Sequence, residues 1–262
     1  MLSLSPASSP NNKRARSKSP LKRSSVDISS IDEGIVQVAE KVCRELMAEN
    51  DASHDYSHAF RVAATAHGLA LQEPGCDVLV CRLASILHDI SDHKYTTSPE
   101  EADGILANAI SKLVQSGLSP ARASHVKNVI DNVSFSKEIN TSDTTGRSSV
   151  ESLELAVVQD ADKLDAIGAI GIARTFTFGG ARKRPLYNPD YPLTNEIVEL
   201  SGEEYAAVST KAAAPTYDHF YEKLLRLQDM MKTESGRKRA RERHAFMESF
   251  LEQFRDEVAG KA

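Results

Sequence analysis

The chain has 262 residues, with 32 lysines and arginines against 37 aspartates and glutamates, and a net charge of −5. The first 25 residues hold six basic residues and no acidic one, so residues 26–262 carry 26 basic and 37 acidic side chains, a net charge of −11. The chain is therefore a basic tail followed by an acidic body. An acidic body argues against nucleic acid as a partner, and it can bind small anions only through a metal ion or local cations.

Composition excludes several classes of protein. With 40% hydrophobic residues, the body can bury a full core. No apolar run approaches the roughly 18 residues of a membrane span, which excludes an integral membrane protein. The N-terminus has no apolar segment of the kind that directs secretion. Three cysteines without a CxxC spacing indicate a reducing compartment and no zinc finger.

Residues 1–30 are predicted to form a disordered tail, because they hold many serines and prolines and almost no large apolar residues. The tail contains two short basic clusters, Lys13-Arg14-Ala15-Arg16 and Lys22-Arg23, among serines that precede proline. This pattern is typical of a nuclear-import signal tuned by phosphorylation. The alternative is a solvated tail without a function. We expect the protein in the cytoplasm, the nucleus or both.

Residues 31–262 are predicted to form one all-α domain, because apolar residues recur at three- and four-residue steps and no strand-like alternation stands out. Ser98-Pro99-Glu100-Glu101 is a strong helix start, with a cap, a proline at the first helical position and acids in the first turn. The expected helices of the first half span residues 31–46, 56–71, 77–90, 98–117 and 119–133.

The second half is predicted to alternate long helices with irregular segments. A polar loop is expected at residues 137–148, followed by one long helix from about residue 150 to 176 that ends at Gly179-Gly180. Residues 181–202 contain three prolines and should form an irregular loop. Two closing helices are expected at 216–231 and 235–258.

Histidine and aspartate residues on these helices are the candidates for chemistry. His58 lies on the second predicted helix, and His88-Asp89 closes the apolar third one. The long helix carries three aspartates in an otherwise apolar and small-residue stretch: Asp160, Asp162 and Asp165. Charged side chains on such helices are costly to bury unless they are paired or bound to metal. Two imidazoles with two carboxylates suit Mn, Fe, Co, Ni or Zn, with Mg less natural.

Helical geometry restricts which of these residues can meet. Asp160 and Asp162 are two positions apart and face away from each other, so only one of them can readily join the histidines. His58 and Arg61 share a helix face, an arrangement that suits a metal-bound phosphate. The alternative is structural: histidines packed in a core, and aspartates paired with Lys163 or Arg174 of the same segment.

The order of these residues resembles the HD-domain metal-dependent phosphohydrolase superfamily, whose pattern is H…HD…D and whose fold is an all-α helical bundle. The resemblance covers roughly residues 32–258. The chain is also similar to one branch of this superfamily, small hydrolases that split nucleoside triphosphates into monophosphate and pyrophosphate, with manganese favoured. Five stretches carry this similarity: HDYSHAFRV, LHDISDHK, QDADKLDAIGAIGIARTFTFGG, DHFYEKLLRLQDMM and TESGRKRARERHAFMESF. It implies the metal ligands His58, His88, Asp89 and Asp162.

The implied reaction is phosphoanhydride hydrolysis of a nucleotide, with a divalent metal ion that lowers the pKa of a bound water. Asp55 and Asp92 are candidates to orient that water or take its proton. The candidate phosphate-binding residues are Arg61, Lys94, Lys137, Arg182 and Lys183. Two alternatives stay open: a nucleotide monophosphatase or cyclic-nucleotide phosphodiesterase on the same metal site, and a helical binding protein without catalysis.

Overall fold

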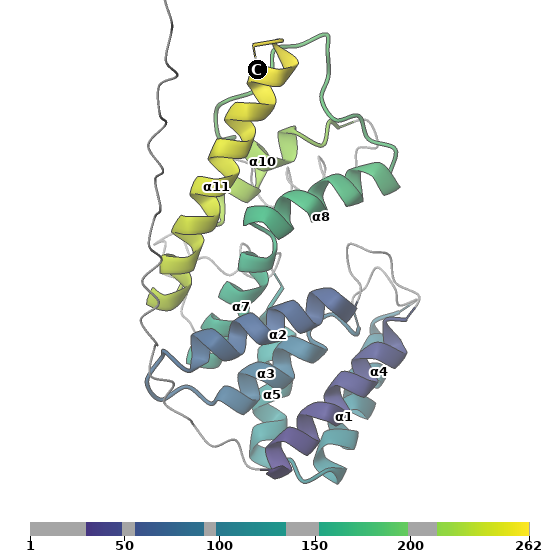
Figure 1. Cartoon of the computed structure of the whole chain (residues 1–262). Coiled ribbons are helices and arrows are strands. Elements are labelled where there is room, and N and C mark those ends of the chain that lie inside the picture. The colour runs from purple at the N-terminus through teal and green to yellow at the C-terminus, as the bar shows by residue number, and fades with distance from the viewer. Residues whose placement is uncertain (1–29, 49–55, 92–97, 135–151, 199–213, 262) are drawn as a thin grey trace, which may run out of the picture.

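The computed structural model describes residues 30–48, 56–91, 98–134, 152–198 and 214–261. Its helices, shown in Figure 1, are α1 (Ser30–Leu46), α2 (Tyr56–Ala70), α3 (Val78–Leu87), α4 (Pro99–Gln115), α5 (Pro120–Asn132), α7 (Leu153–Asp165), α8 (Gly168–Ala181), α10 (Asp218–Glu222), the 3₁₀ turn η1 (Leu224–Arg226) and α11 (Glu234–Val258). No strand occurs among these residues, which confirms the all-α prediction. The predicted tail, except for Ser30 at the start of α1, and the predicted loop at 137–148 lie outside the described residues.

Short polar side chains begin most of the helices. Ser98, Ser119 and Ser152 each accept a backbone hydrogen bond at the start of α4, α5 and α7, and proline follows the first two. Thr233 does the same for α11. Helix α4 ends at Gln115, and Gly117 follows its C-cap residue with a φ of +108°, a conformation that favours glycine. The predicted bounds of these helices are therefore close to the observed ones.

Helix α3 forms the centre of the lower part of the molecule. Eight of its residues, from Leu79 to Leu87 except Arg82, are buried. Helices α1, α2, α5 and α7 pack around it, and α4 covers α1 and α5 (Figure 1). A helix that is apolar on every side needs neighbours on every side, which explains why this one lies at the core. Its last turn delivers His88 and Asp89 next to α2 and α7.

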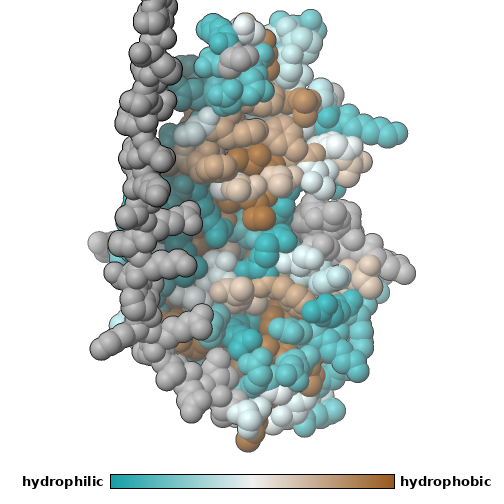
Figure 2. Space-filling model, viewed as in Figure 1, coloured by the Kyte–Doolittle hydropathy of each residue, from teal (hydrophilic) through white to brown (hydrophobic). Residues whose placement is uncertain are grey.

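Helices α8, α10 and α11 form the upper part of the molecule around a cluster of aromatic rings. Phe176 of α8 lies with its ring centroid 5.9 to 6.2 Å from those of Phe220, Phe250 and Phe254. Helix α11 also packs along α7, so it connects the upper part to the lower one. On the face shown in Figure 2, apolar atoms gather in this upper half, where Figure 1 places α8.

The prediction of one long helix from residue 150 to 176 is wrong in one respect, because the structure divides this segment into α7 and α8. Gly168 begins the second helix with a φ of +75°, which turns the chain out of the first. A side chain at Gly171 would collide with the backbone of Ala166, so the turn is also tight. The break decides the direction of α8 relative to the aspartates of α7.

The predicted helix at 216–231 is also shorter than expected. It consists of α10 and η1, separated at Lys223, which has a non-helical φ of −141°. Periodicity cannot separate these, because the apolar residues Phe220, Leu224 and Leu227 are buried in either case. The closing helix α11 lies close to its predicted span.

Candidate metal centre

Three helices bring the predicted metal ligands together. His58 lies on α2, Asp162 lies on α7, and His88 and Asp89 follow the last residue of α3. His58 is 2% exposed and His88 is 8% exposed. Ligand atoms of His58, His88 and Asp89 all lie within 4.8 Å of one another. The four residues are separated by up to 104 positions in the sequence, so only the packing of α2, α3 and α7 makes them neighbours.

The Nε2 atoms of the two imidazoles face the same carboxylate oxygens. His58 Nε2 lies 3.5 Å from Asp89 Oδ2 and 3.4 Å from Asp162 Oδ1. His88 Nε2 lies 3.3 Å and 3.8 Å from the same two oxygens. Ligand atoms that share one ion at about 2.1 Å are separated by roughly 3 to 3.5 Å. The observed separations are therefore close to those of a single mononuclear site.

Hydrogen bonds at Nδ1 determine which imidazole nitrogen is available to a metal. His88 Nδ1 lies 2.8 Å from the carbonyl oxygen of Ser85, which can only accept, so Nδ1 carries the hydrogen. His58 Nδ1 lies 2.7 Å from Asp165 Oδ2, and a carboxylate oxygen likewise accepts. Both imidazoles therefore direct the lone pair of Nε2 toward the carboxylates, as a metal-binding histidine requires.

Asp165 joins His58 to two arginines. Arg61 donates from Nε to Asp165 Oδ1 at 2.8 Å and from Nη2 to Oδ2 at 3.0 Å, and Arg174 donates to Oδ2 at 3.0 Å. Burial raises the pKa of Asp165, but the hydrogen bonds from His58 and Arg61 and the charge of Arg174 outweigh it and lower the pKa to about 2. Asp165 is thus an ionised carboxylate that holds the ring of His58 in place.

The charges of the cluster influence one another strongly in the metal-free chain. Burial lowers the pKa of His58, but the hydrogen bonds with Asp162, Asp165 and Asp89 outweigh this and raise it to about 10. Burial raises the pKa of Asp89, but the imidazoles of His88 and His58 bring it down to about 2. The carboxylates therefore attract a positive charge to the position between the two Nε2 atoms, where a proton and a metal ion would compete.

The donor set fits a divalent metal ion. His88 Nε2 is buried and has no hydrogen-bond partner among the described residues, although two carboxylate oxygens lie nearby. A buried nitrogen without a hydrogen bond costs free energy, and a metal ion would satisfy it. Two neutral nitrogens with two anionic oxygens suit Mn, Fe, Co, Ni or Zn better than Mg.

The structure decides between the two aspartates that helical spacing left open. Asp160 faces away from the histidines and accepts hydrogen bonds from the backbone of Lys232 and Thr233, each at 2.8 Å. The hydroxyl of Thr233 donates to the same carboxylate at 2.7 Å. Asp160 therefore anchors the start of α11, which leaves Asp162 for the cluster.

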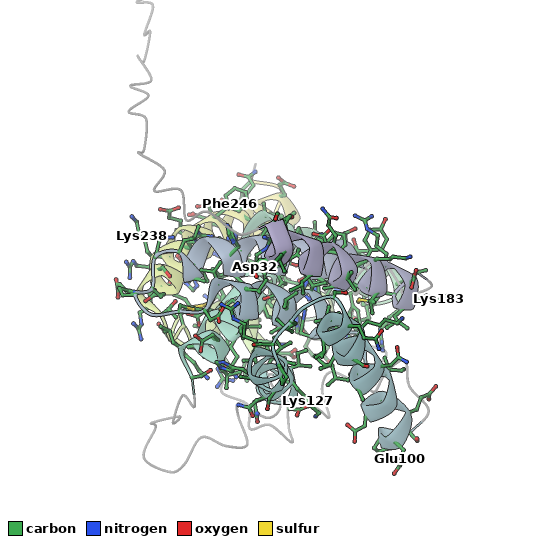
Figure 3. The ribbon with its side chains drawn as sticks, turned by 90° about the horizontal axis from the view of Figure 1, so that it is seen from below. Asp32, Glu100, Lys127, Lys183, Lys238 and Phe246 are labelled. Carbon is green, nitrogen blue, oxygen red and sulfur yellow. The ribbon has the colours of Figure 1, made fainter. Side chains whose placement is uncertain are left out.

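The residues predicted to bind the substrate lie at different distances from the candidate metal centre, and some lie outside the described part of the chain. Arg61 lies one turn from His58, and its side chain is 35% exposed while it binds Asp165. Arg182 stacks on Phe178 at 4.3 Å, and Lys183 follows it with a φ of +57°, at the end of α8 farther from α7. Figure 3 shows Lys183 at the edge of the molecule. Four predicted residues lie outside the described ones: Asp55, Asp92, Lys94 and Lys137.

Asp165 and Arg174 contribute to the site although sequence reasoning gave neither a role there: it named Asp165 only among the candidate aspartates and Arg174 only as a possible partner for them. The signal for Asp165 was its spacing of three from Asp162, which puts both carboxylates on one face of α7. Arg174 is the one charged residue of α8, and the turn at Gly168 directs it back to Asp165. Its charge in an otherwise uncharged helix was the available signal.

Comparison with known proteins gives a consistent family. Residues 55–167 match the family model described as HD domain. YpgQ of Bacillus subtilis, an uncharacterised protein, is 33% identical over 219 residues, which cover 83% of this chain and 90% of YpgQ. Its crystal structure in complex with ADP aligns with a TM-score of 0.61 at 32% identity and covers 86% of this chain and 100% of that one.

Two further crystal structures are similar along most of the chain. A protein from Lactobacillus plantarum aligns with a TM-score of 0.68 at 30% identity, over 89% of this chain and 99% of that one. An HD-superfamily hydrolase from Bacillus thuringiensis aligns with a TM-score of 0.62 at 31% identity, over 87% and 98%. The match to the HD domain and the similarity to these proteins over most of the chain lead to one conclusion: the chain belongs to the HD-domain superfamily and has the fold of its hydrolases.

Proposed function

We propose that this HD-domain phosphohydrolase splits nucleoside triphosphates into the monophosphate and pyrophosphate, with a divalent ion, manganese favoured, held by His58, His88, Asp89 and Asp162. The observation that carries the proposal is the convergence of two Nε2 atoms and two carboxylate oxygens at separations of 3.3 to 3.8 Å. The same residues form the H…HD…D pattern of the resemblance.

Charge supports a nucleotide substrate that binds through the metal. The body carries a net charge of −11, so a phosphate needs a local positive charge in order to approach it. A metal ion between the carboxylates reverses the sign of the potential at that point. The crystal structure of YpgQ with ADP shows that a relative of this chain binds a nucleotide, which favours the same class of ligand here.

The residues of the chain have distinct roles in this proposal. When bound, the ion polarises a phosphoryl oxygen and lowers the pKa of a bound water. Asp165 holds His58, and Ser85 holds His88, in the orientation that presents Nε2. Arg61 lies one turn from His58 on α2 and donates to Asp165, and it is proposed to bind a phosphate oxygen as well. The preorganisation of these side chains reduces the cost of binding the substrate.

Other parts of the proposal rest on the sequence pattern. Asp55 and Asp92 are proposed to orient the attacking water and accept its proton. The remaining phosphate contacts are proposed for Lys94, Lys137, Arg182 and Lys183. The water attacks the α-phosphorus, and the bond from that phosphorus to the bridging oxygen breaks, so pyrophosphate leaves and the monophosphate remains.

A panel of nucleotides with each divalent metal tests the function. Metal-free protein is incubated with triphosphates, monophosphates and a cyclic nucleotide in the presence of Mn, Mg, Co, Ni, Fe or Zn, and pyrophosphate and orthophosphate are quantified separately. We expect pyrophosphate from a triphosphate, with the highest rate in manganese. His88→Ala and Asp89→Ala should abolish turnover while circular dichroism shows an intact helical fold.

Each other result of this panel contradicts the proposal in a distinct way. Orthophosphate as the only product would assign the protein to the monophosphatases, and cleavage of only the cyclic nucleotide would make it a phosphodiesterase. Nucleotide binding without turnover in any metal would identify a binding protein. Full activity in both variants, or after a chelator, would refute the metal site itself.

A further inference from the structure

Two cysteine thiols lie side by side at the start of α3, away from the metal centre. The Sγ atoms of Cys76 and Cys81 are 3.4 Å apart. Cys76 lies in the turn between α2 and α3 and is partly exposed, whereas Cys81 is buried in the first turns of α3. The third cysteine, Cys43 on α1, is buried and contacts the sulfur of Met47 at 3.5 Å instead.

Hydrogen bonds on both sides of the pair hold the two thiols in this position. Asp77 follows Cys76 and caps α3 by accepting from the backbone of Leu79 and Val80. Its own backbone N–H donates to Glu154 at 2.8 Å, and its carboxylate accepts from Arg122 at 2.8 Å. The backbone that carries Cys76 is therefore fixed to α3, α5 and α7, so the thiols are neighbours in the folded chain without further ordering.

The two thiols differ in exposure, and the surroundings of Cys81 make it a weaker acid than an ordinary thiol. The hydrogen bond with Cys76, burial and the nearby carboxylates of Glu154 and Asp77 all raise the pKa of Cys81. A buried thiol with a raised pKa is a poor first target for an oxidant, because the thiolate is the reactive form. Cys76 is the thiol that solvent reaches, and Cys81 is the partner behind it.

We propose that Cys76 and Cys81 are an oxidation site at which a peroxide converts the two thiols into a reversible intramolecular disulfide. In the first step the sulfur of Cys76 attacks a peroxide oxygen and breaks the O–O bond, which gives a sulfenic acid and, with hydrogen peroxide, one water. In the second step the sulfur of Cys81 attacks the sulfur of Cys76, the S–O bond breaks, and the departing hydroxyl takes the proton of the Cys81 thiol and leaves as a second water. The two thiols are oxidised by two electrons and the peroxide is reduced.

The geometry favours this outcome over other products. The sulfur atoms are 3.4 Å apart and must approach to about 2.05 Å, the S–S length of a disulfide. A thiol held at this distance intercepts the sulfenic acid before a second peroxide converts it to sulfinic acid. Cys81 lies near the start of α3 and His88 follows its end, seven residues or about 10 Å further along the helix axis, so the oxidation does not depend on the proposed hydrolase activity.

The experiment uses the full chain and hydrogen peroxide. Reduced protein is treated, free thiols are alkylated, and tryptic peptides are analysed by mass spectrometry. Residues 62–82 contain no other lysine or arginine before Arg82, so both cysteines fall in one peptide. After peroxide treatment we expect this peptide to carry no alkyl group and to be lighter than the reduced, unalkylated peptide by two hydrogens. After treatment with dithiothreitol both cysteines should be alkylated again. Cys43, in a separate peptide, should stay alkylated throughout.

Single variants separate the two roles. Cys81→Ser should leave Cys76 as a sulfenic acid that dimedone traps and that peroxide converts irreversibly to sulfinic acid. Cys76→Ser should make Cys81 as unreactive as Cys43, and Cys43→Ser should behave as the wild type. The proposal is overturned if the wild-type peptide keeps both alkylation sites, if Cys43 is oxidised at the rate of Cys76, or if the disulfide joins two chains.

Discussion

Each histidine of the metal centre uses one nitrogen for a protein partner and keeps the other for the cluster. Ser85 supplies a carbonyl oxygen to His88, and Asp165 supplies a carboxylate oxygen to His58. The two partners differ, because a carboxylate makes the imidazole more basic than a carbonyl does and is itself held by Arg61 and Arg174. Asp165 should therefore influence metal affinity although it is not a proposed ligand.

Asp165→Asn tests this influence. The substitution keeps the size of the side chain but removes the charge that His58, Arg61 and Arg174 bind. We expect affinity for manganese to fall by about 10- to 100-fold, the range typical of residues that orient a metal ligand. Isothermal titration calorimetry measures it directly. Asp131→Asn is the control, because the side chain of Asp131 is 41% exposed and forms an ion pair with Lys127, one turn earlier on α5. Unchanged affinity in Asp165→Asn would contradict the orienting role.

His219 should make the stability of the fold depend on pH. Burial, with the charges of Lys223 and Arg184, lowers its pKa from 6.5 to about 3. Below about pH 6.5 the unfolded chain therefore binds a proton that the folded chain does not accept until about pH 3. The stability due to neutral His219 is complete above pH 6.5 and is lost as the pH falls through this window.

Urea unfolding of wild type and His219→Gln at pH 7 and pH 5 measures this effect in metal-free protein. Between the two pH values the wild type should lose about 1 to 2 kcal/mol more of its free energy of unfolding than the variant does. Other histidines contribute equally to both proteins and cancel in the difference. An identical loss in the two proteins would show that His219 is protonated in the fold as readily as in the unfolded chain.

At the scale of helices, the break between α7 and α8 is the feature that places Arg174 at the site. It depends on Gly168, whose φ of +75° is unfavourable for other residues. The position is also crowded, since a Cβ there would lie 3.0 Å from Cβ and Cγ of Arg243 on α11. Two independent constraints thus require glycine at this position.

Gly168→Ala should lower the free energy of unfolding by about 1 to 3 kcal/mol, from backbone strain and the contact with Arg243. Gly104→Ala on α4 is the matched control, because it is exposed, helical and has nothing within 4 Å of an added Cβ. Alanine there should stabilise the protein by about 0.5 to 1 kcal/mol. Chemical denaturation compares the two, and a Gly168→Ala variant as stable as Gly104→Ala would exclude strain at the turn.

At the scale of the whole molecule, the metal centre joins three helices that belong to different stretches of the chain. An ion held by the proposed ligands of α2, α3 and α7 would bind only the folded state, because the unfolded chain does not bring these residues together. Metal binding should therefore stabilise the fold as a whole.

The described helices also bear on membrane insertion: none of them combines the length and the apolar character that a membrane span requires.

Manganese at about 100 times its dissociation constant should add about 2.7 kcal/mol to the stability of the metal-free protein, which appears as a higher Tm in differential scanning calorimetry. His88→Ala removes one ligand and should lose this shift. His125→Ala is the control: His125 lies beside Ser152 and Glu154, outside the cluster, so the variant should keep the shift. An equal shift in all three proteins would mean that the ion binds elsewhere.

Local signals in the sequence were sufficient for most elements. Capping residues such as Ser98 and Ser119, followed by proline, act within one turn of the backbone and do not depend on the rest of the fold. The helix break at Gly168 was missed because glycine is also compatible with a helix interior, and only the contacts with Ala166 and Arg243 require the turn. Boundaries set by distant contacts could not be predicted from spacing.

The candidate ligands show the same division. By itself, the sequence determined an acidic all-α body with histidines and aspartates on its apolar helices, because these features follow from composition and helical periodicity. The tertiary structure decided that Asp162 joins His58 and His88 while Asp160 anchors α11, and that Asp165 holds His58. The physical reason is that α7 presents aspartates on two faces, and which face meets the histidines depends on how α2, α3 and α11 pack around it.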